Sequence, residues 1–359
     1  MSLSDKEKNR YSRHLLLDKV GLKGQLKLKN AHVLVIGAGG LGCPILMYLS
    51  AAGVGHIGII DFDIIDESNL QRQILFDSKD IGKSKVLTAK RKLAIQNPHI
   101  KITAYNQVLS NQNAIDIFQE YEIIVDGTDN FSTRYMVSDA CVLTEKPLVY
   151  GAIHKFEGQV SVFNYKNGPT YRCLFPTPPE SESTPSCSEA GVIGVLPGII
   201  GTQQANETIK IILEIGNIMS GRLLIYDALQ PSFLEINIEK SANLIDFGIS
   251  SISDFKDFDY LFTCEIDSMQ AGISKKDFLL LPSKTLVIDV REDWETPKVE
   301  NKNILNIPLD ELDDRFNEIP KGETIYVVCQ KGGRSQAAIA FLKQEYNYTN
   351  LINVDGGLL

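Results

Sequence analysis

A run of closely spaced glycines follows an early apolar segment of the chain. The stretch VLVIGAGGLG places Gly37, Gly39, Gly40 and Gly42 between a short apolar run and a helical pattern. Glycines there permit a tight turn, and the following helix N-terminus attracts phosphate through its free amides and dipole. Asp61 follows about 20 residues later, where a carboxylate can bind a ribose hydroxyl. Alone, the pattern indicates a nucleotide site and leaves NAD open.

Charged and polar residues follow the second apolar run. The segment DFDIIDESNLQRQ supplies Asp63, Ser68, Asn69 and Arg72, and Lys85 comes thirteen residues after Arg72. A site that attacks a triphosphate needs such cations, because they neutralise the phosphoryl oxygens in the transition state. A hydride-transfer site has no evident need of them. Each cation taken singly also fits an exposed surface charge, whereas the ordered set favours phosphate chemistry.

A further acidic motif, DGTDN, ends another apolar run. It offers Asp126, Asp129 and Asn130 at the carboxyl edge of the expected sheet, where open α/β sheets bind ligands. One carboxylate there suits Mg²⁺ bound beside phosphates. The motif therefore predicts an acidic residue next to the nucleotide.

Two cysteines have contexts that suggest chemistry. Cys329 ends the apolar run TIYVVC and is followed by QKGGRS and a helical pattern, which places its sulfur among backbone amides with Arg334 beside it. Such a setting lowers a thiol pKa without a histidine, and all five histidines lie at or before His154. Cys187 lies in a proline-rich stretch, residues 172–188, which predicts an exposed, mobile loop.

The elements that position these residues alternate in the first half of the chain. Apolar runs over 32–36, 57–61, 102–105, 123–126 and 148–150, each followed by a helical or loop stretch, predict a Rossmann-like, mostly parallel sheet. Strands over 159–164, 222–226 and 233–238 predict an antiparallel extension, with a long helix over 197–215. A small second α/β unit has strands over 285–290 and 324–329 and a helix over 335–346.

Composition narrows the functional class. The 359 residues are enough for roughly two domains, and a net charge of −9 argues against nucleic-acid binding. No apolar run is long enough to span a membrane, and the N-terminus is charged where a signal peptide is apolar. The six cysteines lack the paired spacing of a disulfide framework. These features predict a cytoplasmic protein.

The motifs GAGGLG, DFDIIDESNLQRQ, GKSK and DGTDN, with RYSRH near the start, closely resemble the MoeB/ThiF family over residues 8–240. That family is related to ubiquitin-activating enzymes. The resemblance implies use of ATP and Mg²⁺ to adenylate the C-terminal glycine of a small ubiquitin-like sulfur carrier protein. It implies that Asp129 is the Mg²⁺-associated catalytic acid and that Arg13 reaches into the partner's site of a homodimer. It also implies an ATP site lined by Gly40, Asp61, Asn69, Arg72, Lys85 and Asp129.

The segments TLVIDVREDWE, NILNIPLDEL, CQKGGRS and NVDGG resemble a rhodanese domain over residues 264–359. The resemblance implies that Cys329 carries a persulfide, and Cys187 matches a cysteine in the crossover loop of MoeB/ThiF proteins. We therefore predict an adenylation domain over 1–240, a linker over 241–263 and a rhodanese-like domain over 264–359. A sulfur donor protein, such as a cysteine desulfurase, is an implied partner.

The chain departs from its relatives at their zinc site, which two CxxC pairs commonly form. Only Cys173 of the first pair is present, Thr170 occupies its partner's position, and no cysteine lies between Cys187 and Cys264. Since a structural zinc needs four ligands, we predict no zinc.

Two other functions remain open at this stage. An NAD-dependent oxidoreductase is supported by the glycine loop and Asp61 but leaves Arg72 and Lys85 unexplained. A non-catalytic scaffold that binds a carrier protein is the other. The sequence does not choose among molybdopterin synthesis, thiamine synthesis and related sulfur-transfer pathways.

Overall fold

The computed structural model describes residues 2–178, 191–230, 232–241, 243–260, 272–300, 302–330 and 332–358. The described residues form two compact units, a larger one that extends to residue 260 and a smaller one that begins at residue 272. Each unit has its own sheet and its own buried apolar core, so each is treated separately.

The larger unit is built on an eight-stranded sheet with the order β3-β2-β1-β4-β5-β6-β7-β8. The first five strands pair in parallel, and β6 to β8 extend the sheet in antiparallel fashion. This confirms the predicted Rossmann-like sheet with an antiparallel extension. The strands are β1 (His32–Ile36), β2 (His56–Ile60), β3 (Lys101–Tyr105), β4 (Ile123–Asp126), β5 (Leu148–His154), β6 (Glu157–Phe163), β7 (Arg222–Asp227) and β8 (Ser232–Asn237).

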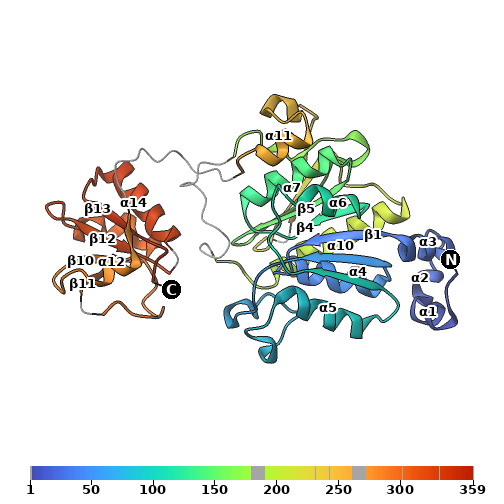
Figure 1. Cartoon of the computed structure of the whole chain (residues 1–359), viewed down its shortest axis with the longest axis horizontal. Helices are drawn as coiled ribbons and strands as arrows, with labels where there is room; N and C mark the ends of the chain where they lie inside the picture. The colour runs from blue at the N-terminus through green and yellow to red at the C-terminus, as the bar shows by residue number, and fades with distance from the viewer. Residues whose placement is uncertain are drawn as a thin grey trace. The chain divides into compact units, whose positions relative to one another are not determined.

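Helices cover both faces of this sheet. Helix α4 packs against α5 and α10 in one layer, while α6 packs against α7 in another (Figure 1). The helices are α1 (Asp5–Arg10), α2 (Ser12–Leu15), α3 (Gly21–Asn30), α4 (Gly42–Ala52), α5 (Lys85–Gln96), α6 (Ala114–Gln119), α7 (Phe131–Leu143), α8 (Tyr171–Leu174), α10 (Leu196–Leu213) and α11 (Ile252–Asp257). Short 3₁₀ turns cover Glu67–Asn69, Ser78–Asp80, Tyr165–Asn167 and Leu244–Phe247.

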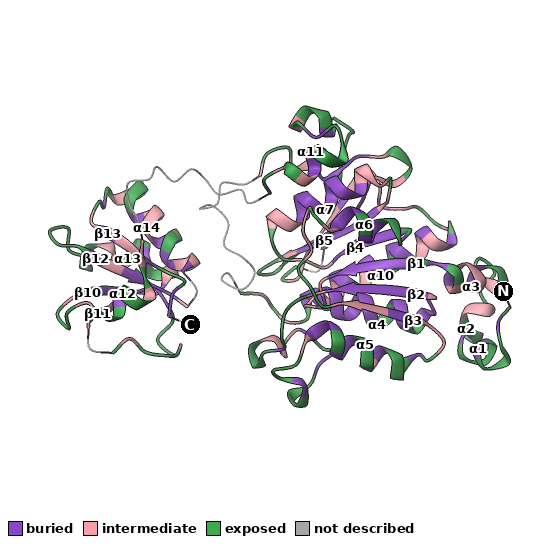
Figure 2. Cartoon of the chain, viewed as in Figure 1, coloured by how far each residue is buried: buried purple, intermediate pink, exposed green. Residues whose placement is uncertain are grey.

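The core lies on the central strands, as their composition requires. Every residue of β2 and β4 is buried, and β1 is exposed only at His32 (Figure 2). Strands that are covered on both faces have continuous apolar sequences, so the sequence predicted the positions of these strands well. Their carboxyl ends meet at one edge of the sheet.

Two regions differ from the sequence-based expectation. The segment expected to be an exposed loop from residue 172 begins inside the core, because Arg172 is only 2% exposed and belongs to α8. Residues 243–260, expected to be linker, pack on the larger unit through Ile249, Phe255 and Tyr260, all of which are buried. Both segments lack a hydrophobic period, so the sequence pattern did not reveal their packing.

The smaller unit has a five-stranded parallel sheet with the order β11-β10-β12-β13-β9. Its strands are β9 (Ile273–Ser274), β10 (Leu286–Asp289), β11 (Asn303–Asn306), β12 (Ile325–Val328) and β13 (Leu351–Asp355). Its helices are α12 (Lys275–Leu279), α13 (Leu312–Arg315) and α14 (Gly333–Tyr346), with 3₁₀ turns at Leu309–Glu311 and Phe316–Glu318. The sequence predicted β10, β12 and α14 but missed β9, β11 and β13.

Among the described residues, none of the helices has both the length and the apolar character needed to cross a membrane.

Candidate functional site

The glycine loop forms a narrow turn between β1 and α4. Gly37 has a φ of +87°, and a Cβ there would lie 2.9 Å from the carbonyl oxygen of Gly127. A Cβ at Gly42 would lie 2.0 Å from the carbonyl oxygen of Gly37. Only glycine fits at these positions. The turn brings the first residues of α4 beside the loop that follows β4, at the carboxyl edge of the sheet.

Asp61 closes this turn from the end of β2. One oxygen of its carboxylate accepts a hydrogen bond from the Ala38 amide at 2.7 Å, and the other accepts from the Asp63 amide at 2.8 Å. Burial raises the pKa of Asp61, and these two amides oppose the shift. Asp61 therefore fixes the glycine loop as well as lying where a ribose hydroxyl would bind.

A lysine and an aspartate meet beside Asp61. The Lys85 ammonium lies 2.8 Å from the Asp63 carboxylate, and the lysine side chain is 8% exposed against 49% for the aspartate. Lys85 is the first residue of α5, whose N-terminus is capped by the Ser84 hydroxyl. Its charge is therefore held in place by a helix start and an acidic partner.

Arg72 approaches the glycine loop from the other side. Its Cγ lies 3.6 Å from the position of a Cβ on Gly40, and its guanidinium donates to the carbonyl oxygen of Ser68 at 3.0 Å. Asp66 caps a short 3₁₀ turn: its carboxylate accepts from the Ser68 amide and hydroxyl, and its amide donates to Asn69 Oδ1. The structure thus brings Arg72 next to the glycine turn, and Ser68 and Asn69 next to Arg72.

The two aspartates of DGTDN have different surroundings. Asp126 is fully buried, and one of its oxygens accepts hydrogen bonds from the Thr128 amide and hydroxyl at 2.9 and 2.6 Å. Burial raises its pKa. Asp129 is exposed, and no partner among the described residues engages its carboxylate. Asn130 caps α7 by accepting from the Thr133 amide at 2.8 Å. Of the two carboxylates, only that of Asp129 is accessible to a ligand.

Arg13 lies apart from the glycine loop of its own chain. Its neighbour Tyr11 packs on Gly53, just past the C-terminal end of α4, and its hydroxyl accepts from Asn97 at 2.8 Å. The glycine loop is at the opposite end of α4, which is 11 residues or about 16 Å long. Arg13 is exposed on α2 and is not brought together with the other candidate residues.

Sequence reasoning did not select Gln73, which lies beside the glycine loop. Its side chain is buried, its Nε2 lies 3.7 Å from the position of a Cβ on Gly39, and its Oε1 lacks a hydrogen-bond partner among the described residues. A polar amide inside a run of polar residues carries no distinctive signal, so only its burial in the fold identifies it.

The Cys173 region shows what replaces the first cysteine pair. Thr170 and Cys173 form the cap of α8, in which the Thr170 amide donates to the Cys173 sulfur at 3.4 Å. Within the described residues, no group of three or more His, Cys, Asp or Glu side chains could hold a metal ion. The absence of zinc stays a prediction.

Cys329 occupies a loop between β12 and α14 in the smaller unit. The Gly332 amide donates to its sulfur at 3.1 Å, and the Ser335 hydroxyl lies 3.4 Å from the sulfur. The side chain is 1% exposed. Arg334 forms a bidentate ion pair with Glu295 at 2.6 and 2.7 Å. The Cys329 sulfur thus accepts a hydrogen bond from a backbone amide at the start of a helix.

Ser335 is a second residue that sequence reasoning missed. Its hydroxyl lies 2.6 Å from Asn353 Oδ1 and 2.9 Å from the carbonyl oxygen of Gly332, as well as near the Cys329 sulfur. One hydroxyl proton serves only one acceptor at a time. Cys187, the other candidate cysteine, lies outside the described residues.

Comparison with protein families accounts for both units. A model described as ThiF family matches residues 11–245, and one described as Rhodanese-like domain matches residues 268–359. The chain belongs to the ThiF family. Its match covers the glycine loop, Arg72, Lys85 and Asp129, while the second match covers Cys329 and Arg334.

Curated relatives are similar to this chain over its whole length or over two thirds of it. A probable adenylyltransferase/sulfurtransferase, MoeZ of Mycobacterium tuberculosis, is 40% identical over 375 residues, covering 100% of this chain and 93% of the relative. A sulfur carrier protein adenylyltransferase of Thermus thermophilus is 47% identical over 246 residues, covering 67% of this chain and 91% of the relative. Both relatives are named as adenylyltransferases.

The ThiF fold also appears among solved structures. Escherichia coli MccB crystallised with ATP aligns with a TM-score of 0.56 at 23% identity, over 66% of this chain and 73% of that chain. This similarity supports the Rossmann-like fold of the ThiF domain.

Proposed function

We propose that this chain uses ATP to adenylate the C-terminal glycine of a small ubiquitin-like sulfur carrier protein and then transfers sulfur to it. The proposal rests on one main observation: Arg72, Lys85 and Asp129 lie around a glycine turn, in a chain whose second unit places the Cys329 sulfur within hydrogen-bond distance of the Gly332 amide. The full-length relative named adenylyltransferase/sulfurtransferase supports the same pairing.

The nucleotide fits the glycine turn. A Cβ at Gly37 or Gly42 would collide with backbone, so the turn is tight enough for the start of α4 to face a phosphate. Asp61 would bind the ribose hydroxyls, and Arg72 and Lys85 would face the phosphates. The remaining proposed contacts to ATP come from Gly39, Gly40, Asp63, Ser68, Asn69 and Asn130.

Magnesium fits the free carboxylate of Asp129. Mg²⁺ typically binds one or two protein carboxylates together with substrate phosphates, so a cluster of protein ligands is not required. When bound, the ion would neutralise phosphate charge. The buried Asp126, whose oxygen is occupied by Thr128, is not suited to this role.

In the first reaction, a carboxylate oxygen of the carrier attacks the α-phosphorus of ATP, and pyrophosphate leaves. Two anions must approach each other, so cations are needed at the phosphates. Arg72 and Lys85 would meet this need, since preorganised charges stabilise the transition state without rearrangement. The product is a carrier acyl-adenylate.

In the second reaction, the terminal sulfur of a Cys329 persulfide attacks the acyl carbon, and AMP leaves. The resulting acyl disulfide is opened when a second thiol attacks the Cys329 sulfur, which releases the carrier thiocarboxylate. We propose Cys187 as that thiol, with a cellular thiol reductant restoring both cysteines. The Gly332 amide, 3.1 Å from the Cys329 sulfur, would stabilise its anionic form.

The edge of the large sheet suits a protein substrate. Strand β8 ends the sheet order, and its Phe233, Leu234 and Ile236 are exposed. An exposed apolar edge strand is a favourable docking site for another chain. We propose that the carrier contacts this edge.

A homodimer would complete the nucleotide site. Within one chain, Tyr11 anchors the N-terminal helices at the end of α4 remote from the glycine loop, and Arg13 is exposed there. Leu16 and Leu17 next to it are exposed as well, as expected for a surface that packs on a partner. We propose that Arg13 acts in the partner subunit's site.

The cellular setting follows from the chemistry. We propose a cytoplasmic protein that receives sulfur from a donor such as a cysteine desulfurase. Its carrier would belong to molybdopterin synthesis, thiamine synthesis or a related sulfur-transfer pathway. Among the described residues, Cys43, Cys141 and Cys329 are free thiols, as a reducing compartment favours.

ATP–pyrophosphate exchange tests the first reaction. Purified full-length protein is incubated with ATP, Mg²⁺, labelled pyrophosphate and each of several carriers that end in Gly-Gly. Exchange with one carrier only would support adenylation and identify the pathway. ATP binding without exchange for any carrier would favour a scaffold, and a lack of ATP binding would contradict the assignment of the nucleotide site.

A further inference from the structure

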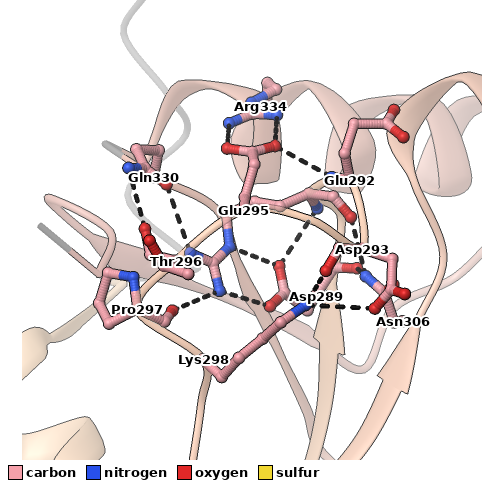
Figure 3. A network of polar contacts seen from close by, with 11 residues as sticks. Asp289, Glu292, Asp293, Glu295, Thr296, Pro297, Lys298, Asn306, Gln330 and Arg334 are labelled. Atoms are coloured by element: carbon pink, nitrogen blue, oxygen red, sulfur yellow. Dashed lines mark hydrogen bonds and ion pairs between the residues drawn. The ribbon is translucent and has the colours of Figure 1, made fainter. Parts of the chain in front are cut away.

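One segment of the smaller unit, residues 292–298, binds the end of the loop that follows Cys329 (Figure 3). Both oxygens of Glu295 accept from the Arg334 guanidinium, at 2.6 and 2.7 Å, and one also accepts from the Glu292 amide at 2.9 Å. Burial raises the pKa of Glu295, but the bonds from Arg334 and Glu292 outweigh it and hold the pKa below its usual value. The pair is a fixed, charged contact at the first turn of α14.

The same segment also binds the beginning of that loop. Gln330 donates from Nε2 to the carbonyl oxygen of Thr296 at 3.3 Å, and its Oε1 accepts from Arg291 at 3.3 Å. Arg291 is itself buried in a bidentate pair with Asp289 at 2.9 and 2.7 Å and donates to the carbonyl oxygen of Pro297 at 2.9 Å. The segment is therefore anchored to the core as well as to Gln330.

Two glycines lie between these anchors. Gly332 has a φ of +96° and is followed by Gly333. Consecutive glycines have access to many backbone conformations, so contacts with other residues determine where the Gly332 amide points. The Ser335 hydroxyl and the Gln336 amide bind the Gly332 carbonyl oxygen. Side-chain anchors at Gln330 and Arg334, on either side of the glycines, add a further constraint.

We propose that Glu295 is a positioning residue for the Cys329 thiolate, acting through Arg334 to hold the Gly332 amide against the sulfur. The proposal rests on the proposed sulfur chemistry at Cys329 and assigns Arg334 a different part in it. Because Glu295 neutralises the guanidinium, Arg334 anchors the loop and does not act as an uncompensated cation beside the sulfur.

The pH dependence of Cys329 alkylation distinguishes the two possible roles of Arg334, an anchor of the loop or a cation that acts directly on the sulfur. Full-length wild type and Glu295→Gln are treated with iodoacetamide across a pH series, and the Cys329 peptide is quantified by mass spectrometry. The pH at which the alkylation rate is half of its maximum reports the thiolate fraction, and this midpoint does not depend on how accessible the sulfur is. Loss of the anchor removes the amide donor, so the midpoint is expected to rise by about one pH unit.

A matched control lies in the same unit. Glu318 forms a bidentate pair with Arg315 at 2.7 and 2.8 Å, remote in sequence from the Cys329 loop and exposed. Glu318→Gln removes a similar pair and should leave the midpoint unchanged. Arg334→Gln should raise the midpoint as Glu295→Gln does, and the double variant should add little, because both act through one contact.

Each remaining outcome counts against the proposal. A lower midpoint in Glu295→Gln would mean that Glu295 only suppresses an activating charge on Arg334. An unchanged midpoint in a folded variant would mean that the pair is structural. Glu295→Asp keeps the charge, so its alkylation midpoint should lie closer to that of wild type than the midpoint of Glu295→Gln does. If the midpoint is not restored and the circular dichroism spectrum shows that the variant is unfolded, the role of Glu295 is structural.

An assay with thiosulfate as the sulfur donor tests the proposed sulfur transfer separately from the role of Glu295. The Cys329 thiolate takes the outer sulfur of thiosulfate as sulfite leaves, and cyanide then removes it as thiocyanate. Glu295→Gln should lower kcat about tenfold with little change in KM, because the nucleophile rather than substrate binding is affected. Absence of turnover in the wild type would contradict sulfur transfer, whereas the alkylation midpoints would still test the role of Glu295.

Discussion

The ammonium of Lys85 lies 2.8 Å from the carboxylate of Asp63, at the edge of the sheet where the glycine loop turns. The lysine is nearly buried and the aspartate is half exposed. A buried cation held by one carboxylate is preorganised for a second anion, such as a phosphate. This relationship leads to the first prediction.

Replacing Lys85 with Ala should reduce carrier-dependent pyrophosphate exchange by about 10²–10³, because the α-phosphate loses a fixed positive charge in the transition state. The nearby Lys83 is itself exposed, and its ammonium lies 3.5 Å from the Asp80 carboxylate, so Lys83→Ala should stay within about twofold of wild type and serves as the control. Equal losses in the two variants would contradict a specific role for Lys85.

Mixing two inactive variants tests whether Arg13 acts across a dimer. Arg13→Ala and Lys85→Ala should each be inactive alone, because each removes one cation from every site. In a mixed dimer, one site keeps its own Lys85 and receives Arg13 from the partner. After subunit exchange, exchange activity should recover to about a quarter of wild type. No recovery despite mixed dimers would show that Arg13 does not act in the partner's site.

Low pH should destabilise the packing of the N-terminal helices, because it protonates Glu7. The bonds from Lys29 and Ser4 outweigh a burial effect that raises the Glu7 pKa, and they lower it from 4.5 to about 2. Since the folded pKa is depressed, the stabilisation is fully present above about pH 4.5 and is lost as pH falls toward 2.

Glu7→Gln should therefore lower the free energy of unfolding by about 2 kcal/mol at pH 7. The difference from wild type should vanish near pH 2. Urea unfolding followed by circular dichroism across pH measures it. Asp5 is exposed, so Asp5→Asn should have a smaller effect. A difference independent of pH would contradict the ionic contribution.

The Arg172–Asp139 pair should be a major stabiliser of the larger unit. Two hydrogen bonds of 2.8 Å join the buried side chains, and breaking a buried pair leaves an uncompensated charge. Arg172→Met should cost about 3–5 kcal/mol. The exposed Arg222–Glu235 pair provides the control, and Arg222→Met should cost less than about 1 kcal/mol.

Tryptophan fluorescence allows the unfolding of the smaller unit to be followed separately. Trp294 is the only tryptophan in the chain, and it lies in the smaller unit. Arg172→Met should shift the circular dichroism transition of the larger unit to lower urea, while the Trp294 fluorescence transition stays in place. A parallel shift of both transitions would show that the two units unfold together.

The sequence predicted the parts of the fold that have a strong local signal. Strands β1, β2 and β4 are continuous apolar runs, since both faces of the sheet are covered. The glycine turn and the carboxylate that follows β2 also have a fixed spacing, so the sequence predicted that both lie at the carboxyl edge of the sheet. The family resemblance already selected Asp129 over Asp126, and the fold adds the physical reason, since Asp126 is buried and burial is not encoded in the motif.

Contacts between distant polar residues were not predictable. Arg172 looked like an exposed loop residue, yet its guanidinium is buried by Asp139, 33 residues earlier, and by the ring of Phe247 at 4.3 Å. Glu295 and Arg334 are 39 residues apart. Such pairs depend on the tertiary fold and leave no period in the sequence.

The central claim is that one chain both adenylates a carrier and sulfurates it through Cys329. The direct measurement is the mass of an accepted carrier after incubation with ATP, Mg²⁺ and a sulfur donor, using wild type and Cys329→Ser. We predict thiocarboxylate with wild type, and with Cys329→Ser acyl-adenylate and unchanged pyrophosphate exchange but no thiocarboxylate. Thiocarboxylate formed by Cys329→Ser, or loss of both activities in a folded variant, would contradict the account.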